Sequence, residues 1–219
     1  MGPDRRRYTR AEMAELPERR TPEEWDRMYI DRDVESMPWY LPTLDPDLDA
    51  ALSRLGIRGG AAADLGTGPG TQAISLAERG FVVTGTDISP TAVARAKEAA
   101  KARRVSVTFV ADDIRATKLT GPFDLIFDRG CLHVLPPERW ERYTRTVVRL
   151  LSPGGWLFLK CFSALEPRET VPHRFTPAEI RSVFGRNFEI CSIAETEYQG
   201  AKTPTPRALF CVLRKPPEG

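Results

Sequence analysis

From residue 61 onward, short apolar runs alternate with stretches in which apolar residues recur at helical spacing. The strand-like runs are AAADL (61–65), FVVTGTD (81–87), VSVTFVAD (105–112), FDLIFD (123–128) and WLFLKCF (156–162). Strands that are apolar on both faces and separated by helices are typical of a parallel sheet covered by helices on both sides. The pattern therefore predicts an α/β fold with a mostly parallel sheet.

The segments between these runs carry helix signals. TQAISLAERG (71–80) closes on a glycine, and Ser89 is placed to cap a helix over 90–103 that starts with proline. PERWERYTRTVVRLL (137–151) has an amphipathic pattern, and TPAEIRSVFG (176–185) reads as a further capped helix. Helices are therefore expected between most of the successive strands.

The alternation changes near the C-terminus. FEICSIAET (188–196) and RALFCVLRK (207–215) follow each other with a polar loop between them and no helix. Two consecutive strands joined in this way are expected to pair as an antiparallel hairpin. The sequence thus predicts a seven-stranded, Rossmann-like sheet whose last two strands form an antiparallel hairpin at its end.

The first 55 residues have a different pattern. They contain two capping signals, Thr9 with Glu12 and Thr21 with Pro22 and Glu24. They also concentrate aromatic residues: Trp25, Tyr29, Trp39 and Tyr40. So short a segment cannot close a core of its own. We therefore expect residues 1–55 to form a helical cap, or lid, over residues 56–219 within a single structural domain.

Composition narrows the functional classes. The chain has 219 residues, of which 41% are hydrophobic and 28% charged, and its net charge is +2. A balance so close to neutral points neither to nucleic acid nor to a membrane surface, and the basic run at 5–7 is interpreted as a solvated tail. No apolar run approaches the ~20 residues of a membrane span, and no secretory signal is recognised. The expectation is a cytoplasmic protein, monomeric or homodimeric, that acts on a small molecule.

The four cysteines are widely separated in the sequence, at 131, 161, 191 and 211. No C-x-x-C pair can be drawn through them, which argues against a zinc ribbon or a thioredoxin-type motif. No metal site is therefore expected. Cys191 and Cys211 lie in apolar runs and are expected to be buried small hydrophobic residues.

DLGTGPGT (64–71) places three glycines at alternate positions directly after a strand. A glycine-rich turn between a strand and a helix offers free N–H groups and a positive helix end to a ligand. Asp87 ends the next strand, where a carboxylate can hold two ribose hydroxyls. Asp112 and Asp113 end the strand after that, where an adenine would lie. Three consecutive strand ends therefore predict an adenosine-shaped slot.

The stretch from about 61 to 160 resembles the class I S-adenosylmethionine-dependent methyltransferases. Four ordered motifs carry the resemblance: DLGTGPGT (64–71), TGTD (84–87), ADDI (111–114) and FDLIFDRG (123–130). It implies that Asp64 and Gly66 hold the methionine end of the cofactor, that Asp87 holds the ribose, and that Asp113 or its neighbour Asp112 contacts the adenine. The full set of cofactor-binding residues implied is Asp64, Gly66, Thr67, Gly68, Gly70, Asp87, Ile88, Asp112, Asp113, Ile114, Asp128 and Arg129. The product would be S-adenosylhomocysteine.

Three further segments resemble the thiopurine, thiol and halide methyltransferase branch: EEWDRMYIDRDVESMPWY (23–40), DRGCLHVLPPERWERY (128–143) and VPHRFTPAEIRSVFG (171–185). The G-P-P-F run usual in that branch is absent. This resemblance implies a small soft nucleophile, such as a thiol, beneath an aromatic lid. The residues expected at the lid or the acceptor are Trp25, Tyr29, Trp39, Tyr40, Cys131 and Cys161.

Arg129, Cys131 and His133 alternate and could share one side of an extended segment. In one interpretation, Arg129 binds an anionic acceptor and His133 removes a proton. In the other, Arg129 pairs with Asp128 or another carboxylate and His133 is a structural residue. Cys131 is expected to be a packed residue, because methyl transfer needs no covalent intermediate. O- or N-methylation of a small heteroaromatic compound, with His133 as base, and a non-enzymatic cofactor sensor are the alternative functions.

Overall fold

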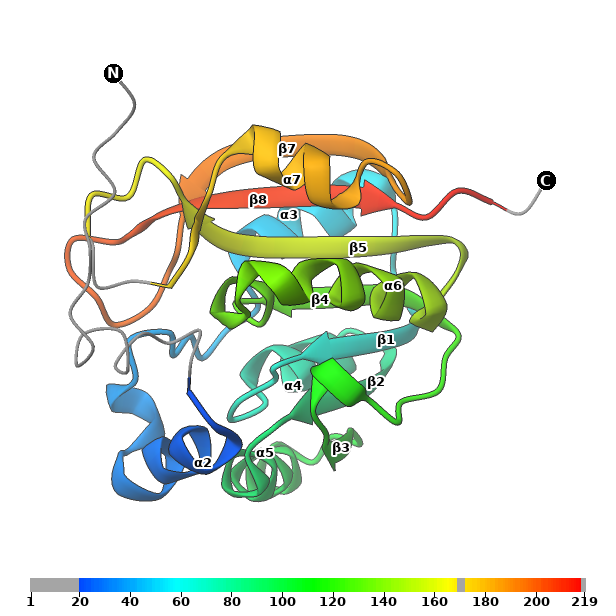
Figure 1. The fold of residues 1–219 in the computed structure, drawn as a ribbon. Coiled ribbons are helices and arrows are strands. Elements are labelled where there is room, and N and C mark those ends of the chain that lie inside the picture. Colours follow the sequence, from blue (N-terminus) through cyan, green and yellow to red (C-terminus); the bar gives the residue numbers. More distant parts are fainter. Residues whose placement is uncertain (1–19, 169–171, 218–219) are drawn as a thin grey trace.

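The computed structural model describes residues 20–168 and 172–217. The capping signal of Thr9 with Glu12 and the basic run at 5–7 lie outside the described residues. Within those residues, one sheet of eight strands has the order β3-β2-β1-β4-β5-β8-β7, with β6 beside β5 off this path (Figure 1). The path of seven strands confirms the Rossmann-like prediction, and β6, Arg174–Phe175, is a two-residue addition to it.

Strands β1 to β5 pair in parallel, and β8 and β7 are antiparallel, as the hairpin prediction requires. Their bounds are β1 Gly60–Leu65, β2 Phe81–Asp87, β3 Thr108–Ala111, β4 Phe123–Arg129, β5 Leu151–Ser163, β7 Glu189–Glu197 and β8 Arg207–Arg214. Because β1 lies between β2 and β4, the order of strands reverses beside it. The carboxyl ends of strands at such a switch point form the usual ligand crevice of an open α/β sheet.

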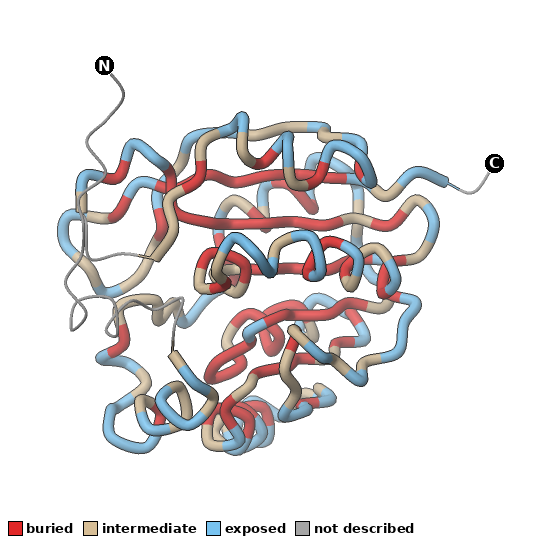
Figure 2. Tube along the Cα trace, viewed as in Figure 1, coloured by how far each residue is buried: buried red, intermediate tan, exposed pale blue. Residues whose placement is uncertain are grey.

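Helices cover both faces of the sheet. Their bounds are α2 Pro22–Asp31, α3 Pro46–Leu55, α4 Thr71–Glu78, α5 Pro90–Arg103, α6 Trp140–Leu150 and α7 Pro177–Phe184. Side chains of α6 and α7 pack into one apolar cluster, and those of α3, α4 and α5 into another. The buried residues follow the central strands between these two layers (Figure 2).

The helix starts agree with the sequence signals. Ser89 caps α5 by accepting the N–H of Ala92. Thr21 and Thr176 each begin a capping box, in which the hydroxyl and the glutamate three residues later satisfy each other's backbone N–H groups. Local hydrogen bonding therefore fixes where α2, α5 and α7 begin.

Two structural details depart from the sequence interpretation. β5 begins at Leu151 rather than at Trp156, because Phe123 pairs with Leu151 before the register shifts, so the Pro-Gly-Gly segment lies inside the strand. The prediction that Cys191 is buried is wrong. Ser192, not Cys191, follows Ile190 in the pairing with β8, so Cys191 is the extra residue of a bulge and its side chain is exposed.

The N-terminal 55 residues divide between two locations. Leu44 and the apolar side of α3 are buried in the same cluster as α4 and α5, so this part belongs to the body of the sheet domain. The segment that lies over the cavity described below is residues 20–40. Of the residues assigned to the cap from sequence, α3 therefore belongs to the body of the domain, and residues 1–19 lie outside the described residues.

Candidate functional site

A cavity of about 280 Å³ opens at the carboxyl ends of β1, β2, β3 and β4, under α2 and the segment that follows it. One half is lined by residues of the strand ends: Gly66, Asp87, Ile88, Asp112, Asp113, Ile114 and Cys131. The other half is mainly aromatic and apolar: Trp25, Met28, Tyr29, Trp39, His133, Phe162, Pro172, Tyr198 and Pro206. The two halves differ in chemistry, as a site for two different ligands requires.

The three glycines of the first turn have positive φ angles and different neighbours. Gly66 lines the cavity and lies against Cys131. A Cβ on Gly68 would lie 2.8 Å from the Tyr29 hydroxyl, and one on Gly70 would lie 2.8 Å from Cβ of Ala96. Of the three glycines, only Gly66 is therefore placed to let a ligand approach the backbone. The missing side chain of Gly68 makes room for Tyr29 of the cap, and that of Gly70 allows helix packing.

Asp87 ends β2 with its carboxylate at the cavity wall. Its Oδ2 accepts the N–H of Gly68 at 2.8 Å and its Oδ1 accepts the N–H of Ser89 at 2.9 Å. Burial raises the pKa of this carboxyl to about 6, against the lowering effect of these hydrogen bonds. The two oxygens together have four acceptor positions, and after a further hydrogen bond from the backbone of Ile88 one remains for a ligand hydroxyl.

Asp64 and Asp128, both expected at the cofactor, lie behind the cavity wall. Asp64 accepts the Thr67 hydroxyl at 2.5 Å, and its burial raises its pKa to about 7. Asp128 accepts the N–H groups of Gly130, Cys131 and Leu132 and the hydroxyl of Tyr143. Neither side chain lines the cavity. Both carboxylates hold the loops whose other residues face the cavity, and their direct contact with a cofactor stays a prediction.

The two acids after β3 both line the cavity. Asp112 accepts the Thr117 hydroxyl and the N–H of Lys118. Burial opposes ionisation of Asp113, but hydrogen bonds from Arg115 outweigh it and hold the pKa of that carboxyl below its ordinary value. Ile114, between Asp113 and Arg115, adds an apolar surface to the wall. Which acid contacts an adenine stays a prediction.

The cap is fastened over the cavity by polar contacts. Asp26 of α2 accepts the Ser89 hydroxyl at 2.6 Å and the N–H of Thr91 at 2.9 Å. The Trp39 side chain hydrogen-bonds Tyr29 and meets Trp25 edge-on, with ring centroids 6.2 Å apart. Trp25, Tyr29 and Trp39 line the cavity, and Tyr40 packs against the apolar cluster that includes Tyr29 and Met37. All four aromatic residues thus belong to the cap, and contact of Tyr40 with an acceptor stays a prediction.

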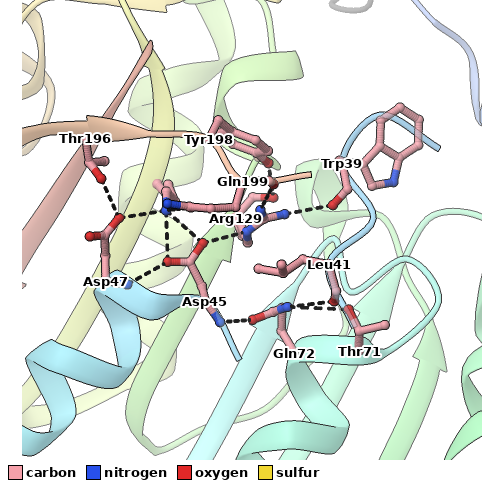
Figure 3. Close-up of polar contacts among 12 residues, drawn as sticks. Trp39, Leu41, Asp45, Asp47, Thr71, Gln72, Arg129, Thr196, Tyr198 and Gln199 are labelled. Carbon is pink, nitrogen blue, oxygen red and sulfur yellow. Dashed lines mark hydrogen bonds and ion pairs between the residues drawn. The ribbon is translucent and has the colours of Figure 1, made fainter. Parts of the chain in front are cut away.

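Arg129 is engaged by a buried polar network (Figure 3). Its Nε donates to Oδ2 of Asp45 at 2.8 Å, and its terminal nitrogens donate to the carbonyl oxygens of Trp39 and Gln199. Lys160, fully buried on β5, donates to both oxygens of Asp45, to Asp47 and to the Gln199 side chain. The interpretation that pairs Arg129 with a carboxylate holds, and the partner is Asp45. The guanidinium joins the cap to the β7–β8 loop, while Arg129 also lines the cavity, so its contact with an acceptor or cofactor stays a prediction.

Cys131 and Cys161 have different locations. Cys131 lines the cavity, and burial raises its thiol pKa well above the ordinary value, so it stays a protonated, packed residue as expected. Cys161 is fully buried in the apolar cluster, and its assignment to the acceptor is corrected. Side chains alternate along a strand, so the next residue, Phe162, is the one that reaches the cavity.

Sequence reasoning missed several wall residues: Arg20, Phe162, Pro172, Tyr198, Lys202 and Pro206. The β7–β8 loop contributes three of them, and it was interpreted only as a polar connection. The sequence reasoning also missed Asp45 and Lys160. The lone lysine inside the apolar run WLFLKCF was the available signal, because a fully buried lysine in a strand requires a carboxylate partner.

Residues 62–155 match a family model that is described as "Methyltransferase domain". A curated relative from Mycobacteroides abscessus, 2-heptyl-1-hydroxyquinolin-4(1H)-one methyltransferase, is 32% identical over 161 residues, which are 72% of this chain and 70% of the relative. The chain belongs to the class I S-adenosylmethionine-dependent methyltransferases. It is therefore an enzyme, which disfavours the sensor alternative.

Other relatives of this methyltransferase differ in acceptor. Probable thiol methyltransferase 2 of Arabidopsis thaliana is 26% identical over 79% of this chain and 76% of its own length. The tRNA 5-carboxymethoxyuridine methyltransferase of Escherichia coli is 36% identical over 54% of this chain and 46% of its own length. The family is thus clear, while the acceptor differs among its members.

Solved structures agree with the fold of the methyltransferase. One described as "Conversion of a Disulfide Bond into a Thioacetal Group during Echinomycin Biosynthesis" has a TM-score of 0.78 and 25% identity, with 91% of this chain and 94% of that chain covered. Magnesium protoporphyrin IX methyltransferase from Synechocystis, solved with bound S-adenosylmethionine, has a TM-score of 0.61 and 26% identity over 76% of each chain.

The strand-end half of the cavity fits S-adenosylmethionine, the cofactor of the family. A carboxylate with an open acceptor position at Asp87 suits a ribose, and acids flanked by the apolar Ile88 and Ile114 suit an adenine. No helix in the described part of the methyltransferase is long and apolar enough to cross a membrane. In the same residues, no group of three or more His, Cys, Asp or Glu side chains is arranged to hold a metal ion.

Proposed function

We propose that this methyltransferase methylates a small, flat acceptor that reaches the site already ionised, with an aromatic or similarly soft thiol as the preferred class. Bound S-adenosylmethionine supplies an activated methyl group, so the chain has to orient the acceptor and exclude water. In this proposal Asp87 binds the ribose, Ile88, Asp112, Asp113 and Ile114 surround the adenine, and the backbone at Gly66 approaches the methionine end.

One observation carries the acceptor class: the acceptor half of the cavity has aromatic walls, and its titratable residues His133 and Tyr198 are held in their neutral forms near neutral pH. Trp25, Trp39, Phe162 and Tyr198 supply flat apolar surface. Burial raises the pKa of the Tyr198 hydroxyl and, in the strand-end half, that of the Cys131 thiol, so neither becomes a base near neutral pH. An acceptor that ionises by itself at neutral pH needs no base, and a thiol of pKa about 8.5 is much nearer to that condition than a phenol of pKa about 10.

A second candidate is O- or N-methylation of a heteroaromatic compound. It is favoured by the relative from Mycobacteroides abscessus, whose name describes a hydroxyquinolinone methyltransferase. The aromatic walls suit such a ring as well as they suit an aromatic thiol. A nucleic-acid acceptor is not part of the proposal, because the cap covers a small cavity of about 280 Å³ and the net charge is only +2.

The test is methyl transfer to a matched panel, read by mass spectrometry. Thiophenol, an N-hydroxy heteroaromatic, phenol and aniline share a small flat ring and differ in the nucleophile, and transfer RNA serves as the nucleic-acid arm. The expected order of kcat/KM is thiophenol first, the N-hydroxy compound second, and phenol and aniline far behind. Aniline or transfer RNA as the preferred substrate would contradict the proposal.

A further inference from the structure

His133 lies in the acceptor half of the cavity, in the short 3₁₀ helix Leu132–Val134 that follows the turn after β4. The residue is only 4% exposed. Its ring stacks on Phe162 with centroids 4.7 Å apart and an interplanar angle of 9°, and it is tilted against Tyr198 at 5.7 Å. Two aromatic neighbours therefore fix the plane of the imidazole.

The hydrogen bonding of His133 determines which nitrogen carries the proton. The N–H of Phe162 donates to Nδ1 of His133 at 3.4 Å. Because Nδ1 is an acceptor there, the single proton of the neutral imidazole lies on Nε2. The neutral ring thus has a donor at Nε2 and no free acceptor.

Nε2 has no hydrogen-bond partner among the described residues, although the side chain is almost fully buried. Nε2 and the Tyr198 hydroxyl both lie against Gly130, where an added Cβ would be 3.0 Å from Nε2 and 2.5 Å from that oxygen. Gly130, His133 and Tyr198 all line the cavity. A buried N–H left without a partner costs about 1–3 kcal/mol. Such a group at a cavity wall indicates a ligand that accepts its hydrogen bond.

The charges around His133 keep it neutral. Burial is the largest influence, and Arg129 from β4 and His173 from the segment before β6 add repulsion, which together lower the pKa of the ring to about 3. Tyr198, from the segment after β7, contributes a protonated hydroxyl that donates to the backbone oxygen of Arg129 at 2.8 Å. A ring that resists protonation in this way is a poor general base, since a base works best with a pKa near the operating pH.

We propose that His133 is the hydrogen-bond donor that receives the ionised acceptor: Nε2–H donates to the anionic sulfur or oxygen, and the protein removes no proton. This rests on the proposed function. The acceptor's proton leaves to solvent before binding. A lone pair of the acceptor then forms the new bond to the methyl carbon, while the bond from that carbon to the donor sulfur breaks and its electrons stay on that sulfur. His133 thereby selects nucleophiles that bind as anions and disfavours neutral amines, whose one lone pair the donor would occupy.

The test uses a chromophoric acid, 4-nitrophenol, bound in the presence of S-adenosylhomocysteine, so that no transfer occurs. Absorbance against pH gives the pKa of the bound probe for the wild type, His133→Phe and His133→Gln. A hydrogen bond to an ionised group should favour the bound anion by roughly 10- to 100-fold, lowering the bound pKa by about one to two units. His133→Phe should lose this shift, and His133→Gln, whose amide also donates, should recover part of it.

Unchanged calorimetric binding of S-adenosylhomocysteine verifies that each variant is folded and holds the product. A lowered bound pKa that persists in His133→Phe, or a bound pKa above that of the free probe in the wild type, would overturn the assignment of His133. Failure of the proposed function is separate: it would appear as absence of methyl transfer to every thiol and hydroxyl of the panel, whatever the probe's pKa. If the pH profile of kcat/KM for a thiol rises near pH 6.5 in the wild type and this rise is lost in His133→Phe, His133 would instead be a general base.

Discussion

Arg129 and Asp45, 84 positions apart in the chain, form an ion pair in which Nε and Oδ2 are 2.8 Å apart and both side chains are buried. The same guanidinium lies over the Tyr198 ring, 4.5 Å from its centroid, and donates to the carbonyl oxygen of Trp39. One side chain thus touches the cap, the β7–β8 loop and the segment before α3. Its removal should loosen three elements at once.

Arg129→Met should therefore lower the free energy of unfolding by about 3–5 kcal/mol, because it leaves part of a buried charge network without its partner. Urea unfolding measures this. Arg79→Met is the matched control, since Arg79 pairs with Asp49 at an exposed site, and it should cost about 0–1 kcal/mol. An Arg129 variant with wild-type stability and lost turnover would mean that the guanidinium serves the acceptor instead.

The burial of His133 predicts a pH-dependent stability difference between the wild type and His133→Phe. The pKa of the ring is about 3 in the folded protein, against about 6.5 for an unperturbed imidazole. Between these values the unfolded chain binds a proton that the native protein excludes, so the wild type loses stability as the pH falls below 6.5. The loss approaches about 1.4 kcal/mol per pH unit.

Chemical unfolding of the two proteins at several pH values between 4 and 8 isolates this contribution, because all other groups are common to both. The stability of the wild type relative to the variant should be constant above about pH 7 and decline below it. A difference that rises as the pH falls would mean that the native protein stabilises the protonated ring.

The contacts of Asp26 predict a role in keeping the cap closed. Loss of its hydrogen bonds to Ser89 and Thr91 in Asp26→Ala should cost about 1–2 kcal/mol and raise the open population of α2 by about 5- to 30-fold. Hydrogen exchange of α2 amides should accelerate, and KM for the acceptor should rise. Asp31→Ala, on the same helix with its side chain exposed, is the control. Unchanged exchange and KM in Asp26→Ala would remove the cap from the mechanism.

Elements whose signals are local could be predicted from the sequence. α5 begins and ends where Ser89, Pro90 and the apolar pattern indicate, and β2 has the predicted bounds. The parallel pairing of β1 to β5 and the antiparallel hairpin of β7 and β8 followed from the alternation of strands and helices and its change near the C-terminus. Local hydrogen bonding and side-chain periodicity act over a few residues, so the sequence displays them directly.

The parts that could not be predicted depend on contacts between distant segments. The pairing of Lys160 with Asp45 joins positions 115 residues apart. The exposure of Cys191 follows from a bulge, and the placement of Cys161 in the core and Phe162 at the cavity follows from the phase of β5. Shifting a strand by one residue exchanges its two faces, and an apolar run with hydrophobic residues on both faces does not reveal that phase.

Binding of S-adenosylmethionine to Asp87 variants, measured by titration calorimetry, tests the central claim most directly. The wild type should bind, and Asp87→Ala should bind roughly 10- to 150-fold more weakly while remaining folded, the scale of hydrogen bonds to a charged group. Asp124→Ala, at the opposite end of the strands where Asp124 accepts the N–H of Ala61 at 2.9 Å, should bind like the wild type. Equal affinity of the wild type and a folded Asp87→Ala variant would contradict the proposed cofactor site.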